Sequence, residues 1–304
     1  MPELYNSLSS YLKSLFGCKV FKVTLDPGLS CPNRDGSKGV GGCAYCSSST
    51  LLPKDHIPEA QIREQLLSGI EYVRKRHKAE KFIAYFQVNT NTHAPVDELK
   101  RLYEQALIPE VAAIAVSTRP DCLSNEVLDI LCWLKTKKHL WLELGLQSAN
   151  DATLALINRG HTKADFEGAA KRATQRGLDV CAHIIIGLPG EGEKDALETT
   201  AFLNSLPIKG IKFHQLQIVR GTALEALWNK GEVRTQSLKE YASVMVKCIE
   251  RLRGDIIIHR LCGDVPRQFL VAPVWGRSKF EVIEKITGLM KEQGTHQGAL
   301  YAPI

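Results

Sequence analysis

A chain of 304 residues with 44% hydrophobic and 24% charged residues has the composition of a globular protein with a large core. It lacks a run of about eighteen apolar residues, and its first segment lacks the basic-then-apolar order of a signal peptide, so we expect no membrane association and a cytoplasmic location. The formal net charge of +6 permits a polyanionic partner without requiring one.

Short apolar, β-branched runs alternate with amphipathic segments, and this alternation predicts parallel βα units. The candidate strands are 20–25, 82–87, 112–117, 140–146, 179–186 and 211–219. The candidate helices are 59–78, a segment with Leu99, Leu102 and Ala106 on one face, one capped by Ser124, and one that begins at Thr162 and stops at Gly177. We therefore predict an α/β fold, a partial (βα)6 TIM-like barrel.

The pattern changes after residue 220. A helix over 238–253, a short strand over 255–259 and a last helix over 279–293 are expected there. We interpret residues 1–220 as the barrel core and residues 221–304 as an extension that closes the open side of the barrel and shapes the substrate site.

Polar residues follow each predicted strand. In a parallel barrel the loops after the strands meet at one end, so these residues predict a shared active-site rim. The segments are the cysteine loop, 89–93, 118–121, 147–148, 187–191 and 220–222.

The stretch 25–49 holds Cys31, Cys43 and Cys46, one cysteine followed after eleven residues by a C-x-x-C pair, in a glycine-rich loop. Three thiolates without a fourth protein ligand predict an iron–sulfur cluster with one iron open to a substrate or cofactor. The alternatives are a structural zinc knuckle and a redox pair. Zinc requires a fourth ligand, and the next candidate, His56, has no partner nearby.

The other six cysteines are interpreted as buried free thiols, which require a reducing compartment. They are Cys18, Cys122, Cys132, Cys181, Cys248 and Cys262.

The cysteine motif resembles that of the radical S-adenosylmethionine (SAM) superfamily, and the run CPNRDGSKGVGGCAYC resembles the YhcC/YtqA-type family of its Elp3-like branch. Further similar segments are 84–87, 117–123, 141–149, 157–161, 183–192 and 259–275, so the resemblance covers nearly the whole chain. It implies a radical SAM-type barrel and an enzyme. It also implies that a [4Fe-4S] cluster on Cys31, Cys43 and Cys46 cleaves SAM to a 5′-deoxyadenosyl radical.

The same resemblance implies roles in holding SAM. Gln147 is expected at the ribose hydroxyls, Arg159 at the methionyl carboxylate, and Tyr45 against the adenine. Arg159 as a surface side chain is the alternative.

The run from His183 through Gly187 to Glu191 is similar to the superfamily's G-x-I-x-G-x-x-x-E element, which backs the adenine. His183 stands where the first glycine would be, and it can either contact the ribose or serve as a core histidine. Glu191 can instead cap the following helix. The residues that bind the SAM amine are left open, because 87–92 replaces the family's G-G-E-like element.

Eight residues are candidates for contact with substrate, although each can instead satisfy backbone carbonyls. They are Asn89, Asn91, His93, Arg119, Asp121, His214, His259 and Arg260.

The resemblance to Elp3 implies tRNA as substrate, with chemistry on the C5 side chain of a wobble uridine, such as removal of a carboxymethyl group to leave an aminomethyl group. It also implies flavodoxin or ferredoxin as electron donor. Basic residues in the last third of the chain agree with a polyanion but fit a solvated helix surface equally. The alternatives are a radical SAM enzyme acting on a small metabolite or tetrapyrrole, and a metal-bearing RNA-binding module.

Overall fold

The computed structural model describes residues 3–47, 50 and 61–303. Its first elements are α1 (Leu8–Phe16), β1 (Val20–Leu25), α2 (Ile62–His77), β2 (Lys81–Phe86), α3 (Val96–Glu104), β3 (Val111–Thr118), the 3-10 turn η2 (Pro120–Cys122), α4 (Asn125–Lys137), β4 (His139–Gln147), α5 (Asp151–Leu156) and α6 (Lys163–Gln175). Then follow β5 (Asp179–Ile186), α7 (Glu193–Asn204), β6 (Gly210–Gln215), β7 (Ile218–Val219), α8 (Ala223–Asn229), α9 (Leu238–Arg251), β8 (Ile257–Arg260), β9 (Leu270–Ala272) and α10 (Lys279–Glu292).

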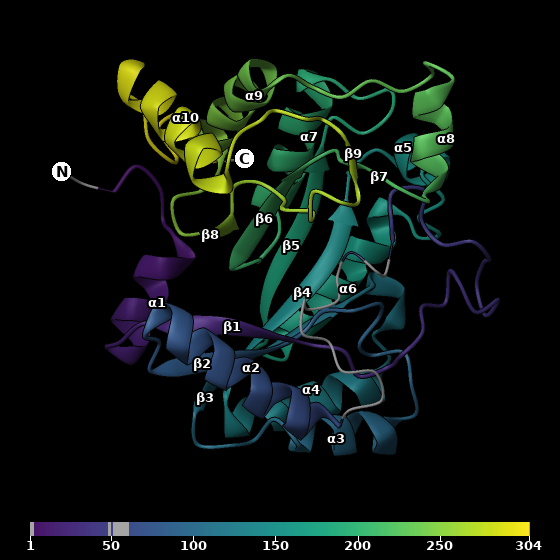
Figure 1. Ribbon diagram of the computed structural model, residues 1–304, viewed down its shortest axis with the longest axis vertical. Helices are drawn as coiled ribbons and strands as arrows, with labels where there is room; N and C mark the ends of the chain where they lie inside the picture. The colour runs from purple at the N-terminus through teal and green to yellow at the C-terminus, as the bar shows by residue number, and fades with distance from the viewer. Residues whose placement is uncertain (1–2, 48–49, 51–60, 304) are drawn as a thin grey trace.

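Seven parallel strands form one sheet in the order β1-β2-β3-β4-β5-β6-β8. The sheet curls into an incomplete barrel with helices on its convex side, as Figure 1 shows. The predicted α/β partial barrel is confirmed, and the sheet is one strand wider than the six predicted. The added strand, β8, comes from the C-terminal extension and pairs with β6. The predicted division at residue 220 stays a prediction.

The bounds of β1 and β5 are those predicted, whereas the predicted strand 211–219 is interrupted. β6 ends at Gln215, whose side chain accepts from the Gly263 amide at 2.7 Å and donates to the Gly263 carbonyl at 3.3 Å. The chain then leaves the main sheet, and β7 pairs with β9 in a separate antiparallel sheet.

The predicted helix starts at Ser124 and Thr162 are confirmed, since each side chain accepts a backbone N–H of its own first turn. The helix predicted over 59–78 spans Ile62–His77, and residues 59–60 lie outside the described residues. Ala106 was expected on the helix with Leu99, but α3 ends at Glu104, and Ala106 is buried in the turn that follows.

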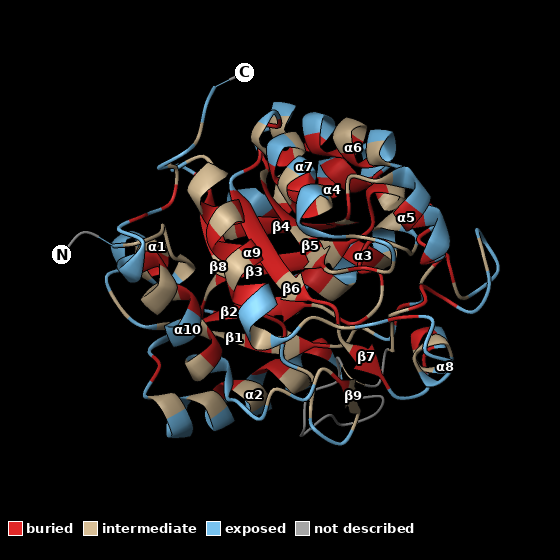
Figure 2. Cartoon of the chain, turned by 90° about the horizontal axis from the view of Figure 1, so that it is seen from above, coloured by how far each residue is buried: buried red, intermediate tan, exposed pale blue. Residues whose placement is uncertain are grey.

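Both faces of the strands are buried, as expected for a parallel sheet. One face packs under the surrounding helices, while inward-pointing side chains such as Ile83, Ala115, Trp141 and Cys181 fill the lower interior of the barrel. Figure 2 shows the buried strands and helix faces in red beneath an exposed outer helical surface.

The helix α1 contacts both β1 and β8, the two edge strands of the open barrel. Its Leu12 is buried in the lower interior, and Tyr11 packs edge-on against Trp141. The segment before it runs beside β8, where the Ile258 amide donates to the Asn6 carbonyl at 2.8 Å. The helix α1 therefore lies against both edges of the open barrel.

Among the described residues, no helix has the length and apolar character needed to cross a membrane.

Candidate active site at the carboxyl ends of the strands

A cavity of about 250 Å³ lies where the loops after the strands meet. Eleven of the residues predicted from the sequence line it: Cys31, Cys43, Tyr45, Cys46, Asn89, Arg119, Gln147, Arg159, His183, His214 and Arg260. They come from loops and strands spread over more than two thirds of the chain. The convergence supports the predicted shared rim.

The cysteine loop is bound to the segment after α5 through two asparagines. Asn33 Nδ2 donates to the Asn158 carbonyl at 2.5 Å and approaches Cys43 Sγ at 3.6 Å, while Asn158 Nδ2 donates to the Gly42 carbonyl at 2.9 Å. The Ala44 amide adds a bond to the Ile157 carbonyl at 2.9 Å. These contacts fix Cys43 relative to the barrel.

Arg159 lies beside Cys43, and three of the five N–H groups of its buried guanidinium have acceptors. Nη1 donates to Cys43 Sγ at 3.5 Å, Nη2 to the Gly145 carbonyl at 2.9 Å, and Nε to His161 Nε2 at 2.8 Å. Burial alone would raise the pKa of the Cys43 thiol, but Arg159 lowers it below its usual range, which favours the thiolate. Burial and the charge of Arg159 lower the pKa of His161 to about 3, so His161 stays neutral and accepts the bond.

Gly145 leaves the space for this arrangement. A Cβ there would lie 2.5 Å from Gln147 Nε2 and 2.6 Å from Arg159 Nη2. The register of β4 against β5 also shifts between Gly145 and Gln147, and Gln147 has a φ of 75°. The bulge turns the Gln147 side chain onto the cavity wall.

Arg119 reaches the cavity from the end of β3. It donates twice to Asp121, at 3.0 and 2.9 Å, and Asp121 also pairs with Lys38 of the cysteine loop at 2.7 Å. Burial would raise the pKa of Asp121, but these two cations lower it to about 2. Arg119 Nη1 is buried without a partner in the described part of the chain.

The three thiols suit an iron–sulfur cluster. They share one cavity, yet among the described residues no three His, Cys, Asp or Glu side chains are arranged to hold a single metal ion. Ligands of a cluster stand farther apart than ligands of one ion, because the cluster itself lies between them. The orphaned Nη1 of Arg119 and the Arg159 bond to Cys43 provide positive charge suited to thiolates and inorganic sulfide.

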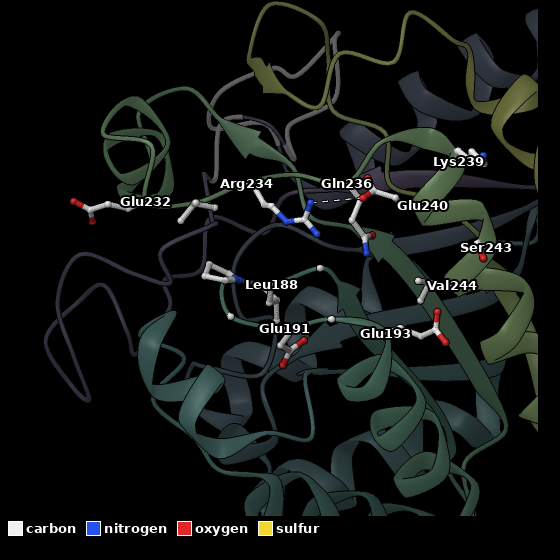
Figure 3. A pocket seen from close by; sticks show the side chains of 15 residues that line it. Leu188, Glu191, Glu193, Glu232, Arg234, Gln236, Lys239, Glu240, Ser243 and Val244 are labelled. Carbon is white, nitrogen blue, oxygen red and sulfur yellow. Dashed lines mark ion pairs between the residues drawn. The ribbon is translucent and has the colours of Figure 1, made fainter.

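Two predicted cofactor residues lie elsewhere. Gly187 and Glu191 line a second cavity of about 810 Å³ between the loop after β5 and the segment that leads into α9, shown in Figure 3. Glu191 accepts a hydrogen bond from Ser148, and burial raises the pKa of its carboxyl. The structure does not bring Gly187 or Glu191 to the cysteine cavity.

Several predicted substrate residues also lie outside it. Asn91 is fully buried and bonds to the Ser117 carbonyl at 2.9 Å, whereas His93 reaches Asp35 of the cysteine loop at 2.8 Å. His259 packs edge-on against Trp141 beneath the cavity, with ring centroids 4.3 Å apart. Asp121 holds Arg119 rather than lining the cavity itself.

A buried charged cluster on the inner wall of the barrel, centred on Glu143, was not predicted from the sequence. This carboxylate accepts from Lys22 at 3.2 Å, Ser117 at 3.1 Å, His183 at 2.9 Å, and Lys212 at a shorter distance. Burial would raise the pKa of Glu143, but Lys212 and Lys22 hold it well below its usual range. A charged residue inside an apolar strand run such as WLELGL, which needs a buried partner, was the available signal.

Comparison with known proteins agrees with this geometry. A sequence profile of the Radical SAM superfamily matches residues 31–203, and one of the Radical_SAM C-terminal domain matches residues 208–292. The chain belongs to the radical SAM superfamily and is an enzyme of that class. The superfamily implies SAM and a [4Fe-4S] cluster as cofactors.

Its relatives include YtqA of Bacillus subtilis, 36% identical over 298 residues that cover 98% of this chain and 92% of YtqA. YhcC of Escherichia coli is 37% identical over 305 residues that cover 100% of this chain and 97% of YhcC. The predicted YhcC/YtqA-type family is confirmed. Elp3 of the archaeon Methanocaldococcus infernus has a similar fold, with a TM-score of 0.73 and 18% identity, over 91% of this chain and 64% of that protein.

Proposed function

We propose that this radical SAM enzyme modifies tRNA, at the C5 side chain of a wobble uridine. The observation that carries the proposal is the cavity that joins the three cysteines to an inner barrel wall with buried polar and charged side chains. Bound there, a [4Fe-4S] cluster and SAM would supply one-electron cleavage of SAM, with the electron delivered by flavodoxin or ferredoxin.

The cysteine loop supplies the ligands Cys31, Cys43 and Cys46. Arg159 offsets the negative charge of the Cys43 thiolate and, by resemblance, also faces the methionyl carboxylate of SAM. Gln147 and Tyr45 line the same cavity, as binding of the ribose and adenine requires. His183 is held by Glu143 at 2.9 Å, which leaves its other edge for a cofactor or substrate.

The proposal of a tRNA substrate comes from the resemblance to Elp3, and human Elongator complex protein 3 is a partial relative of this chain. That protein is 27% identical over 168 residues, which cover 54% of this chain and 30% of the human protein. The basic residues of the last third give partial support. Lys247, Arg253 and Arg277 are used in ion pairs, whereas Arg220, Lys230 and Arg267 are exposed and form no ion pair with any described residue.

Two measurements test this function. Anaerobically reconstituted protein with SAM and dithionite should release 5′-deoxyadenosine, whereas a metal-bearing RNA-binding module would release none. Nucleosides from the tRNA of a strain that lacks the protein should then show an altered wobble uridine. An unchanged profile would remove tRNA as substrate and leave a small metabolite or tetrapyrrole.

A further inference from the structure

The inner wall of the barrel carries charges at the level just below the cysteine loop. Lys212 of β6 is fully buried and donates to Tyr85 Oη at 2.9 Å and to Glu143. Lys22 of β1 also donates to Glu143, at 3.2 Å. Two lysines therefore share one carboxylate, so positive charges outnumber negative ones here before any further cation is counted.

Arg260 is that further cation. It ends β8, stands opposite Lys212 in the register of the sheet, and lines the cavity. The other arginines of the cavity wall each have an acceptor: Arg34 the Cys46 carbonyl at 2.7 Å, Arg119 the Asp121 carboxylate, and Arg159 the Gly145 carbonyl. Arg260 forms no hydrogen bond or ion pair with any described residue. A guanidinium stays charged in a protein, so Arg260 carries a positive charge without an ion-pair partner among the described residues.

His214 adds a second unused donor beside it. It lies on β6 two residues beyond Lys212, on the same face, and its Nε2 is buried without a partner in the described part of the chain. Its ring stacks on His183 with centroids 5.8 Å apart, and Glu143 occupies Nε2 of His183. Burial and then Arg260 hold the pKa of His214 well below its usual value, so the ring is neutral and can donate from Nε2.

Other charges nearby do not satisfy Arg260. Lys279, at the start of α10, is a further cation whose pKa is lowered by burial and then by Arg260. Asp264 lies in the exposed loop after β8 and forms no ion pair with any described residue. Among the described residues the inner wall therefore carries more positive than negative charge, and Arg260 has no paired acceptor there. His214 Nε2 is buried, which makes an unmatched donor costly unless a ligand completes it, and the half-buried Arg260 guanidinium is open to a ligand in the cavity.

We propose that Arg260 and His214 bind a carboxylate of the substrate and select for substrates that carry one. The planar guanidinium accepts a carboxylate through two parallel bonds, and the neutral imidazole supplies a third donor. A carboxylate at the end of a flexible side chain can enter this cavity, whereas a backbone phosphate carries a nucleoside on either side. This proposal rests on the proposed function for the identity of the substrate, a carboxylate-bearing uridine side chain.

The test compares two synthetic anticodon stem-loops that differ at one group. The C5 side chain of the wobble uridine ends in a carboxylate in one and in an uncharged carboxamide in the other. Their binding to reconstituted protein with SAM and without reductant is measured by fluorescence anisotropy at fixed salt. Wild type should bind the carboxylate roughly 10- to 100-fold more tightly, the range for a charge-assisted pair in a buried site.

Arg260→Met should reduce that preference to about onefold while the carboxamide stem-loop still binds, which shows that the variant is folded. Arg260→Lys should keep part of the preference, because it keeps the charge but loses the fork. Arg267→Met is the matched control, since Arg267 is exposed on the same segment. It should change the two affinities equally and leave their ratio intact. Equal binding of both stem-loops by wild type, or a preference that survives Arg260→Met, would overturn the proposal.

A second measurement separates this proposal from the tRNA hypothesis. Thermal unfolding is followed in sodium acetate, sodium phosphate and sodium chloride at equal ionic strength. The gain in melting temperature of wild type over Arg260→Met should be larger in acetate than in the other two salts, because the general effect of each salt on burial cancels in that difference. This result without stem-loop binding would refute tRNA as substrate and retain the carboxylate site. A larger gain in phosphate than in acetate, or no gain in acetate, would contradict the carboxylate assignment.

Discussion

Replacing Glu143 by glutamine tests the buried cluster on the barrel wall. The change preserves shape but removes the only carboxylate that Lys212 contacts among the described residues. The side chains of Glu143 and Lys212 are 0% and 1% exposed, so water cannot take over the role of the carboxylate. Removing one partner of such a pair costs roughly 3–5 kcal/mol of unfolding free energy.

The assay is urea unfolding followed by circular dichroism, with the double variant Glu143→Gln/Lys212→Met as the partner measurement. The double variant should be more stable than Glu143→Gln alone, because it removes the lysine that Glu143→Gln leaves buried without its carboxylate. Glu71→Gln is the matched control. Its pair with Lys75 lies at 2.6 Å but is well exposed, so the loss of stability should be much smaller than for Glu143→Gln.

The same cluster predicts a pH dependence. Because the folded-state pKa of Glu143 is depressed, its stabilising contribution is complete above the unfolded value of about 4.3 and declines as the pH falls. Stability of Glu143→Gln should therefore fall less between neutral and acid pH than that of wild type. A Glu143→Gln cost as small as that of Glu71→Gln would refute the buried-charge reasoning.

Further changes probe the cysteine cavity. Gly145→Ala places a Cβ 2.6 Å from Arg159 Nη2. The variant should lose about 1–3 kcal/mol of unfolding free energy, measured in urea, and should release less 5′-deoxyadenosine. Unchanged values would show that the cavity wall can relax around the added methyl group. Asn158→Ala removes the 2.9 Å bond to the Gly42 carbonyl and should reduce the iron retained per chain after anaerobic gel filtration. Asn204→Ala is the control, because Asn204 ends α7 and bonds to the Arg251 carbonyl instead of the cysteine loop. Asp121→Asn should make the melting temperature depend less on pH between pH 4 and pH 2. The wild-type ion pair stabilises the protein above the unfolded pKa of about 3.9 and is lost as the pH falls through the folded pKa of about 2. Parallel plots of melting temperature against pH for wild type and variant would contradict this.

The barrel could be predicted from the sequence because its strands are local signals. The run DVCAHIII is apolar and lies between glycines at 177 and 187, and its predicted bounds match β5. The role of α1 could not be found in this way. This helix packs against both β1 and β8, and Ser7 forms a bridge to Ile258. These contacts join segments more than two hundred residues apart, so no local sequence pattern indicates them.

The site was predicted unevenly for the same reason. The cysteine triad is a local pattern, and the structure places its three thiols in one cavity. His259 and Arg260 are neighbours in sequence, yet His259 packs beneath the cavity against Trp141 while Arg260 lines it. Alternation along a strand separates such neighbours, and sequence alone did not fix the register.

Anaerobic reconstitution tests the central claim most directly. After incubation with iron and sulfide, the protein should hold iron and sulfide in the ratio of a [4Fe-4S] cluster and convert SAM to 5′-deoxyadenosine under dithionite. Replacing Cys43 by alanine should abolish both. A colourless protein with one tetrahedral zinc at these cysteines and no 5′-deoxyadenosine would contradict the account.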